Sequence, residues 1–363
     1  MCNSFQMLFN DVSHSIQKDI TRIPELKDGE ILVKNKYVTL CGSDIHTYTG
    51  KRKEPSPIVL GHEIVGEIVA LGSNIAFHDL EGTILKIGDI VTWTIFSTCE
   101  DDEFVRDGIP QKSKKLFKYG HVQFSESNSY NGGLATHCVL REGTAILKLP
   151  ASIPLKLAPI INCAGATVMA CFRIIENIKH KNVLIIGAGV LGLIAAAVAK
   201  KSGAATVTLM DVDKKRLEQA KVFGADFTCN IKEEKTQIEN ITNKFYKNGF
   251  DVVIDMSGSW EAMKLGLELS ATGAQNIWVG GVTPMNDLPI NPEQIIRKIL
   301  TIKGMHNYNH EDFLKAVKFF EKHSCEFPFI NFIEAEYPLE HVEEAFQYAV
   351  KNKPFRVLIA NER

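Results

Sequence analysis

A glycine-rich turn between an apolar run and a helix-forming stretch constrains the fold of this chain more than any other segment. The run Asn182–Ile186 is typical of a strand buried on both faces, and the stretch Leu191–Lys201 is typical of a helix. Between them, the G-x-G-x-x-G spacing at 187–192 permits a tight turn, close approach of backbone amides to a pyrophosphate and close helix–sheet packing. The helix N-terminus adds partial positive charge there. The turn therefore predicts a dinucleotide-binding unit. Its expected cofactor contacts are Gly187, Gly189, Val190, Leu191 and Gly192.

An acidic residue after the next strand distinguishes a cofactor turn from a turn that merely contains glycines. Asp211 lies nineteen residues after Gly192, at the end of the predicted strand Thr206–Met210. A carboxylate at this position hydrogen-bonds the adenosine ribose diol and repels a 2′-phosphate, and the neighbouring Val212 offers no cation. The spacing therefore predicts that NAD(H) is preferred over NADP(H).

The hydrophobic pattern changes along the chain and indicates two domains. The first part is β-rich and is interrupted by Gly and Pro turns. From about Lys181 strands and helices alternate, which predicts a doubly wound parallel α/β sheet. We expect a β-rich domain over 1–160, completed by 307–363, and an α/β domain over 161–306. The strands expected are 29–33, 37–40, 63–69, 182–186, 206–210, 251–255, 276–279, 330–336 and 355–359, and the helices are 191–201, 214–223, 311–322 and 339–351.

Composition excludes several classes of protein. The formal net charge is -2, so there is no global attraction to nucleic acid. The longest apolar runs are far shorter than the roughly 20 residues that span a bilayer. The first residues lack the basic and apolar regions of a signal peptide, so we expect a cytoplasmic protein that binds neither nucleic acid nor membrane. In that compartment the 8 cysteines are more plausible as buried thiols or metal ligands than as disulfides.

Two thiols and an imidazole stand out as candidate metal ligands. Cys41 opens the segment Cys-Gly-Ser-Asp-Ile-His at 41–46, His62 lies in Gly-His-Glu at 61–63, and Cys163 follows Asn162. A single Cys or His is usually a core residue or a satisfied polar group. Together, however, Cys41, His62 and Cys163 suit a tetrahedral catalytic zinc ion with one open position.

In these motifs and in their order, the chain resembles the zinc-dependent medium-chain alcohol dehydrogenases over essentially its full length. The resemblance implies a GroES-like catalytic domain, a Rossmann NAD-binding domain and a homodimer or homotetramer. It implies that Cys41, His62 and Cys163 hold the zinc, with Glu63 as a neighbouring carboxylate able to approach the metal. It also implies the following roles: Ser43 receives the substrate's proton, His46 relays it through the nicotinamide ribose, and Arg356 reaches the cofactor pyrophosphate. For Ser43 and His46, simple turn chemistry is the alternative.

One departure from the family concerns a second, structural zinc site. The four cysteines that many relatives carry in one loop correspond here to Cys99, Asp102, Val105 and Ser113. Structural zinc needs a closed shell of four ligands, so we predict a single zinc ion per chain. The irregular loop over 99–121 must then be held by packing and ion pairs.

Local stretches, among them 91–93, 108–112, 116–121 and 162–168, are similar to zinc dehydrogenases associated with phosphonate metabolism. Several cations could bind an anionic substrate through charge-assisted hydrogen bonds, although a solvated basic loop explains them equally well. These cations are Lys51, Arg52, Lys53 and Lys118.

The sequence therefore predicts an NAD-dependent zinc oxidoreductase that acts on an alcohol, aldehyde or ketone, with an anionic phosphonate- or phosphate-bearing substrate as one possibility. Two alternatives stay open: a neutral polyol or sugar as substrate, and a dehydrogenase-fold binding or structural protein without catalysis. The pocket is expected to be shaped by Ser43, Trp93, Ile95, Tyr119 and the approach to Met305.

Overall fold

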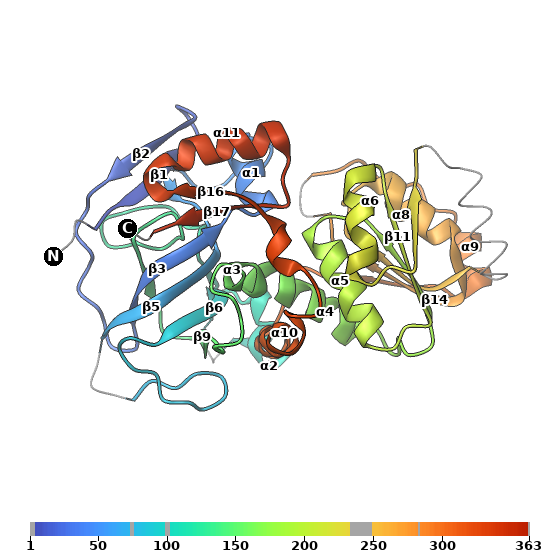
Figure 1. Cartoon of the computed structure of the whole chain (residues 1–363), viewed down its shortest axis with the longest axis horizontal. Coiled ribbons are helices and arrows are strands. Elements are labelled where there is room, and N and C mark those ends of the chain that lie inside the picture. Colours follow the sequence, from blue (N-terminus) through green and yellow to red (C-terminus); the bar gives the residue numbers. More distant parts are fainter. Residues whose placement is uncertain (1–3, 73–75, 99–101, 233–248, 282–283, 362–363) are drawn as a thin grey trace. The chain divides into compact units, whose positions relative to one another are not determined.

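The computed structural model describes residues 4–72, 76–98, 102–232, 249–281 and 284–361. The chain divides into two compact units (Figure 1). The β-rich unit consists of Met1–Ala166, Tyr308–Ser324 and Phe329–Arg363, and the α/β unit consists of Thr167–Asn307 and Cys325–Pro328. No helix in the described ranges is both long and apolar enough to cross a membrane.

Two sheets form the β-rich unit. The larger has the order β16-β17-β3-β5-β6-β7, with β8 paired to β3 and β9 paired to β6, and the smaller has the order β2-β1-β4. Alternating burial along strands such as β3 is what a sheet with one core-facing side requires. The strands are β1 (Gln6–Asn10), β2 (Ser15–Asp19), β3 (Ile31–Thr39), β4 (Ile58–Val59), β5 (Glu63–Leu71), β6 (Ile90–Ser97), β7 (Phe117–Lys118), β8 (His137–Leu140), β9 (Thr144–Lys148), β16 (Ile333–Pro338) and β17 (Arg356–Ala360).

Helices and the C-terminal segments complete this unit. Helix α11 packs against β16 and β17 (Figure 1) and contributes Val342, Ala345 and Phe346 to the core of the sheet. The helical segments are α1 (Gly42–Tyr48), α2 (Glu103–Arg106), η1 (Pro110–Lys112), α3 (Ala158–Ile160), the π-helical turn η2 (Ile161–Gly165), α4 (Ala166–Ile174, which continues into the α/β unit), α10 (His310–His323), η4 (Phe329–Phe332), η5 (Leu339–His341) and α11 (Val342–Asn352).

The α/β unit contains one parallel six-stranded sheet in the order β12-β11-β10-β13-β14-β15. The order reverses beside β10, which is the topological switch point where doubly wound sheets bind ligands. The predicted doubly wound fold is therefore confirmed. The elements are β10 (Asn182–Ile186), α5 (Val190–Lys201), β11 (Thr206–Asp211), α6 (Lys214–Ala220), η3 (Lys221–Phe223), β12 (Phe227–Asn230), β13 (Phe250–Asp255), α8 (Trp260–Glu268), β14 (Ser270–Trp278), α9 (Pro292–Lys298) and β15 (Thr301–Gly304).

Two local predictions were wrong. The strands expected at 29–33 and 37–40 are a single strand, β3, which continues through the polar residues between them. Asn35 can lie there fully buried because its side-chain amide donates to Gly133 O at 3.2 Å and to Ala135 O at 2.8 Å. The segment Gly42–Tyr48, for which no helix was predicted, forms helix α1.

The segment expected to be an irregular loop contains α2, η1 and β7. Cys99 lies outside the described residues, but two other positions at which relatives hold cysteines are hydrogen-bonded to each other. The Ser113 hydroxyl donates to Asp102 Oδ2 at 2.9 Å, and the same oxygen accepts from Lys114 N at 2.8 Å. Asp102 Oδ1 accepts from Phe104 N and caps α2. Local hydrogen bonds therefore connect the segment where the relatives use metal ligands.

Candidate metal centre and cofactor site

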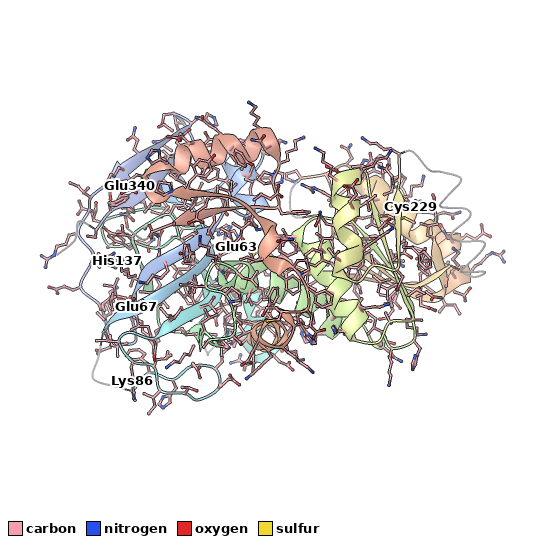
Figure 2. All side chains as sticks on the ribbon, in the orientation of Figure 1. Glu63, Glu67, Lys86, His137, Cys229 and Glu340 are labelled. Atoms are coloured by element: carbon pink, nitrogen blue, oxygen red, sulfur yellow. The ribbon has the colours of Figure 1, made fainter. Side chains whose placement is uncertain are left out.

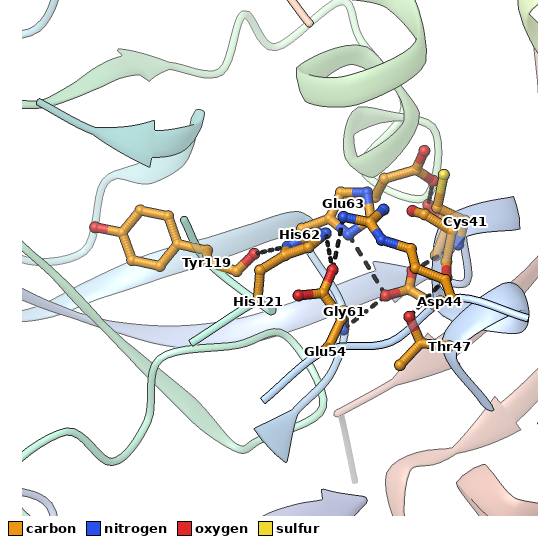
Figure 3. A network of polar contacts seen from close by, with 12 residues as sticks. Cys41, Asp44, Thr47, Glu54, Gly61, His62, Glu63, Tyr119 and His121 are labelled. Carbon is orange, nitrogen blue, oxygen red and sulfur yellow. Dashed lines mark hydrogen bonds and ion pairs between the residues drawn. The ribbon is translucent and has the colours of Figure 1, made fainter. Parts of the chain in front are cut away.

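Four potential metal ligands meet inside the β-rich unit. The ligand atoms of Cys41, His62, Glu63 and Cys163 all lie within 4.8 Å of one another, and no other such group is found among the described residues. Cys41 precedes α1, and His62 and Glu63 stand at the start of β5 (Figure 3). Cys163 lies in η2. Two thiols, an imidazole and a carboxylate are the donor set that zinc prefers, so these residues fit a zinc ion.

A buried aspartate holds two of the ligand segments together. Asp44 Oδ2 accepts from Cys41 N at 2.9 Å, which forms the capping box of α1, and Asp44 Oδ1 accepts from Gly61 N at 3.1 Å. The same Oδ1 lies 3.4 Å from His62 Nδ1 (Figure 3). A carboxylate behind a metal-binding histidine fixes the orientation of its ring. The sequence analysis assigned no role to Asp44, although its place three residues after a helix-capping position was a signal.

A second buried network fixes the turn that carries Cys163. The Asn162 side-chain amide donates to Trp93 O at 2.9 Å and to His62 O at 3.3 Å. The Tyr308 hydroxyl donates to Asn162 O and accepts from Ile95 N at 2.9 Å. A π-helical turn has fewer regular hydrogen bonds than an α-helix and occurs often at functional sites, so these side chains supply what its backbone lacks. Sequence reasoning missed both Asn162 and Tyr308.

Glu63 is fully buried and is neutralised by Arg356. The guanidinium donates from Nε to Oε2 at 2.8 Å and from Nη2 to Oε1 at 2.9 Å, and the Thr39 hydroxyl donates to Oε2 at 2.5 Å. Glu67 shows the contrast, since it lies on the same strand but is partly exposed and paired with Lys36 (Figure 2). Arg356, assigned from the family to the cofactor pyrophosphate, is here first of all the partner of Glu63, with Nη2 3.9 Å from Cys41 Sγ.

Burial and mutual contact shift the titration of these groups. The thiols of Cys41 and Cys163 contact each other. This contact lowers the pKa of Cys41, while the same contact and burial raise the pKa of Cys163, so Cys41 ionises first. Burial raises the pKa of Glu63 to about 7 despite Arg356. Burial disfavours a charged His62, but Asp44 outweighs it and raises the pKa of His62 to about 10. The surroundings of His62 thus favour a positive charge on its ring, and a bound metal cation would replace the proton that carries this charge.

The expected relay residues both lie on α1. Ser43 is half-buried and its carbonyl accepts from the Thr47 hydroxyl at 3.1 Å. His46 is half-buried as well, and burial, assisted by Lys51, lowers its pKa. The helix therefore presents a hydroxyl and an imidazole three residues apart, directly after the candidate metal ligand Cys41. Their part in proton transfer stays a prediction.

The four candidate substrate cations separate into two kinds. Lys51 and Lys53 are exposed, and Lys53 pairs with Asp11 at 2.9 Å. Arg52 and Lys118 are half-buried, and both act electrostatically on groups of the metal cluster or its neighbours. Among the predicted pocket residues of this unit, Trp93 and Tyr119 are fully buried.

The glycine turn of the α/β unit has the predicted geometry. Gly187 has φ of +108°, and a side chain on Gly192 would place its Cβ 1.8 Å from Gly187 O. Asp211 Oδ2 accepts from Ala188 N at 2.6 Å, so the carboxylate at the end of β11 touches the turn. Val190 and Leu191 open α5 directly after the turn. The backbone is compact where a pyrophosphate would approach, and these residues fit a dinucleotide.

Arg216 lies beside this turn, and the sequence did not predict it as a cofactor contact. Its Nη1 lies 3.8 Å from the position that a Cβ on Gly189 would occupy. It stands on α6, which Asp213 caps by accepting from Lys215 N and Arg216 N. Its position shortly after Asp211, at the start of the next helix, was the signal in the sequence that could have indicated a cofactor contact. A guanidinium here is suited to the oxygens of a bound nucleotide.

Comparisons with known proteins match both parts of the chain. The model of the alcohol dehydrogenase GroES-like domain matches residues 27–151, and the model of the zinc-binding dehydrogenase matches residues 190–322. The chain is 30% identical over 359 residues to D-arabitol-phosphate dehydrogenase of Enterococcus avium, covering 98% of this chain and 94% of the relative. It is 27% identical over 359 residues to sorbitol dehydrogenase of Bacillus subtilis, covering 97% and 96%.

Among solved structures, an alcohol dehydrogenase of Thermotoga maritima has a TM-score of 0.93 and 27% identity, with 99% of each chain covered. The two folds, the metal-ligating cluster and these similarities define one class. The chain belongs to the family of zinc-dependent medium-chain alcohol and polyol dehydrogenases, with a GroES-like domain and a Rossmann-type domain.

Proposed function

We propose that this protein is an NAD(H)-dependent, zinc-dependent dehydrogenase that interconverts a polyol-type alcohol and its carbonyl form. The observation that carries the proposal is the convergence of Cys41, His62 and Cys163 within 4.8 Å, with Asp44 behind the imidazole. A protein without catalysis has no need for three such ligands beside an open position, so we favour an enzyme over a binding or structural role.

The residues of the chain would share the work as follows. A bound zinc ion supplies Lewis acidity that lowers the pKa of an alcohol. Cys41, His62 and Cys163 would hold that ion. Ser43 would accept the substrate's proton, and His46, on the same helix, would pass it on. Glu63 would stay close to the ion, held there by Arg356, and a role of Arg356 at the cofactor pyrophosphate stays a prediction.

For the cofactor we propose NAD(H). The support is Asp211, whose carboxylate already bonds the glycine turn and would meet a 2′-phosphate as a like charge. Arg216 does not reverse this preference, because the carboxylate stands at the end of β11 itself while the guanidinium approaches from the next helix.

For the substrate we propose a polyol that carries a phosphate or phosphonate group, with a neutral polyol as second candidate. The similarity to D-arabitol-phosphate dehydrogenase supports the first and the similarity to sorbitol dehydrogenase the second. We further propose a homodimer or homotetramer that pairs through the edge of the α/β sheet, where β15 has a neighbour on one side only.

Elemental analysis combined with cofactor-linked assays tests the proposal. We expect one zinc ion per chain and NADH formation from at least one member of a panel of polyols and polyol phosphates. A protein that binds NADH but takes up no zinc would refute the metal assignment. A zinc-loaded protein without measurable NADH binding would refute the cofactor assignment.

A further inference from the structure

A second polar cluster lies against the metal-ligating His62 and has no part in holding the metal. Its members are Arg52, Glu54, Lys118 and His121. The ring of His121 packs on the ring of His62 with centroids 5.0 Å apart, and Figure 3 shows Glu54 and His121 beside it. We call these four residues the flanking cluster. All four belong to the β-rich unit.

Backbone contacts fix the cluster relative to the metal ligands. Arg52 N donates to His46 O at 3.1 Å, which places Arg52 directly after the relay helix. Lys118 lies opposite Phe96 on the strand pair β6–β7, and His121 N donates to Lys118 O at 3.1 Å. Together with the ring contact between His121 and His62, these bonds place the cluster beside the ligand segments.

The cluster holds two cations and a single carboxylate. Arg52 Nη2 lies 2.6 Å from Glu54 Oε1, which pairs those two charges. The side-chain ammonium of Lys118 has neither a hydrogen bond nor an ion pair with any described residue, although the side chain is half-buried. Burial and the nearby Arg52 lower the pKa of Lys118, while the thiols of Cys163 and Cys41 raise it. A buried cation beside another cation is costly unless an anion joins them.

The cluster also presents hydrogen-bond acceptors beside its cations. Buried Glu54 Oε1 is paired with Arg52 at 2.6 Å and forms no further hydrogen bond with a described residue. His121 Nδ1 bonds Tyr119 O at 2.8 Å and must donate its proton there. In the neutral ring this tautomer leaves Nε2 as an acceptor, and Nε2 lies 3.9 Å from Glu54 Oε1. A substrate hydroxyl between these two atoms would be within hydrogen-bond reach of both.

We propose that the flanking cluster is the substrate's recognition subsite, in which Lys118 and Arg52 bind a phosphate or phosphonate group and Glu54 and His121 accept from substrate hydroxyls. A polyol phosphate supplies both partners, an oxyanion for the cations and hydroxyls for the acceptors. A simple carboxylate ion supplies only the first. This inference rests on the proposed function, since the alcohol is taken to react at the neighbouring metal cluster.

Binding of inorganic phosphate and methylphosphonate to the zinc-loaded protein tests the subsite directly. Calorimetric titrations with saturating NAD+ keep the cofactor's own phosphate site filled. We expect Lys118→Met to weaken binding of both anions about 10- to 100-fold, as for loss of one charge-assisted contact, and Lys118→Arg to restore most of it. Lys53→Met, at an exposed lysine already paired with Asp11, is the matched control and should bind as the wild type does. Equal anion binding by wild type and Lys118→Met would overturn the proposal.

Kinetics separate failure of the subsite from failure of the proposed function. The ratio of kcat/KM for D-arabitol phosphate to that for D-arabitol should fall about 10- to 100-fold in Lys118→Met and remain at the wild-type value in Lys53→Met. An unchanged ratio in an active Lys118→Met enzyme refutes the subsite alone. If no alcohol is oxidised but phosphate still binds through Lys118, the subsite stands and the dehydrogenase proposal is wrong.

Discussion

The metal centre and the cofactor turn differ in how much of the chain each one needs. The cofactor turn is local, because one β-α-β segment between 182 and 211 supplies its glycines and its carboxylate. The metal centre draws on the start of α1, the start of β5 and the turn η2, and Arg356 arrives from the last strand. A local site is specified by backbone conformation, whereas a site of distant segments exists only after the β-rich unit has folded. Substitutions that affect one site and spare the other test this difference.

The strongest test removes a metal ligand. We expect Cys163→Ala to lose zinc and to reduce turnover by at least about 1000-fold, since the ligand shell is no longer complete. NADH binding measured by fluorescence titration should stay within a factor of two of the wild type, because the cofactor turn lies in the other unit. A parallel loss of NADH affinity would show that the two sites are not independently specified.

The next largest effect is expected at Ser43. Ser43→Ala should lower kcat by about 100-fold or more, because the first proton acceptor is gone, while zinc content and NADH affinity are unchanged. His46→Gln should matter less, since water can replace the outer end of the relay. The control is Ser13→Ala, which removes an exposed hydroxyl that lies 2.8 Å from the Ser15 hydroxyl, outside the metal cluster. Full turnover by Ser43→Ala would show that the Ser43 hydroxyl has only a local structural role and takes no part in proton transfer.

A smaller effect is expected in the cofactor turn. Asp211→Ala should weaken NADH binding about 10- to 100-fold, because the ribose loses charge-assisted hydrogen bonds, and should narrow the preference for NADH over NADPH. Zinc content measured on the same sample should not change. Titrations of both cofactors into wild type and variant check this. NADPH binding as tightly as NADH to the wild type would contradict the role given to Asp211.

The same contrast explains what the sequence could predict. The glycine turn, Asp211 and the order of strands and helices in the α/β unit follow from local patterns, and the cysteine and histidine ligands follow from short motifs. The supporting contacts could not be predicted, because Asp44, Tyr308 and the Glu63–Arg356 pair depend on which distant segments become neighbours. The continuous strand β3 was missed for a related reason: a buried Asn35 reads as a break until the loop carbonyls that satisfy it are known.

The smallest effect concerns the segment where relatives hold structural zinc. We predict one zinc ion per chain, and elemental analysis that finds two would contradict it.

In place of a metal, Asp102 joins Ser113, Lys114 N and Phe104 N. Although burial opposes ionisation, these hydrogen bonds lower the pKa of Asp102, so their stabilising effect is present at neutral pH and is lost as pH falls through the lowered pKa. Asp102→Ala should therefore lower the apparent melting temperature by about 2 to 4 °C at pH 7, and the difference should shrink toward pH 3.

Glu103→Ala provides the matched control for this substitution. Glu103 lies next to Asp102 in the same segment, but its ion pair with Lys114 at 2.8 Å is formed by two exposed side chains and should contribute little. We therefore expect Glu103→Ala to melt with the wild type, and chelators of loosely bound metal to leave the melting of both proteins unchanged. If Asp102→Ala and Glu103→Ala melt alike at pH 7, the carboxylate of Asp102 does not replace the metal, and packing alone would hold the segment.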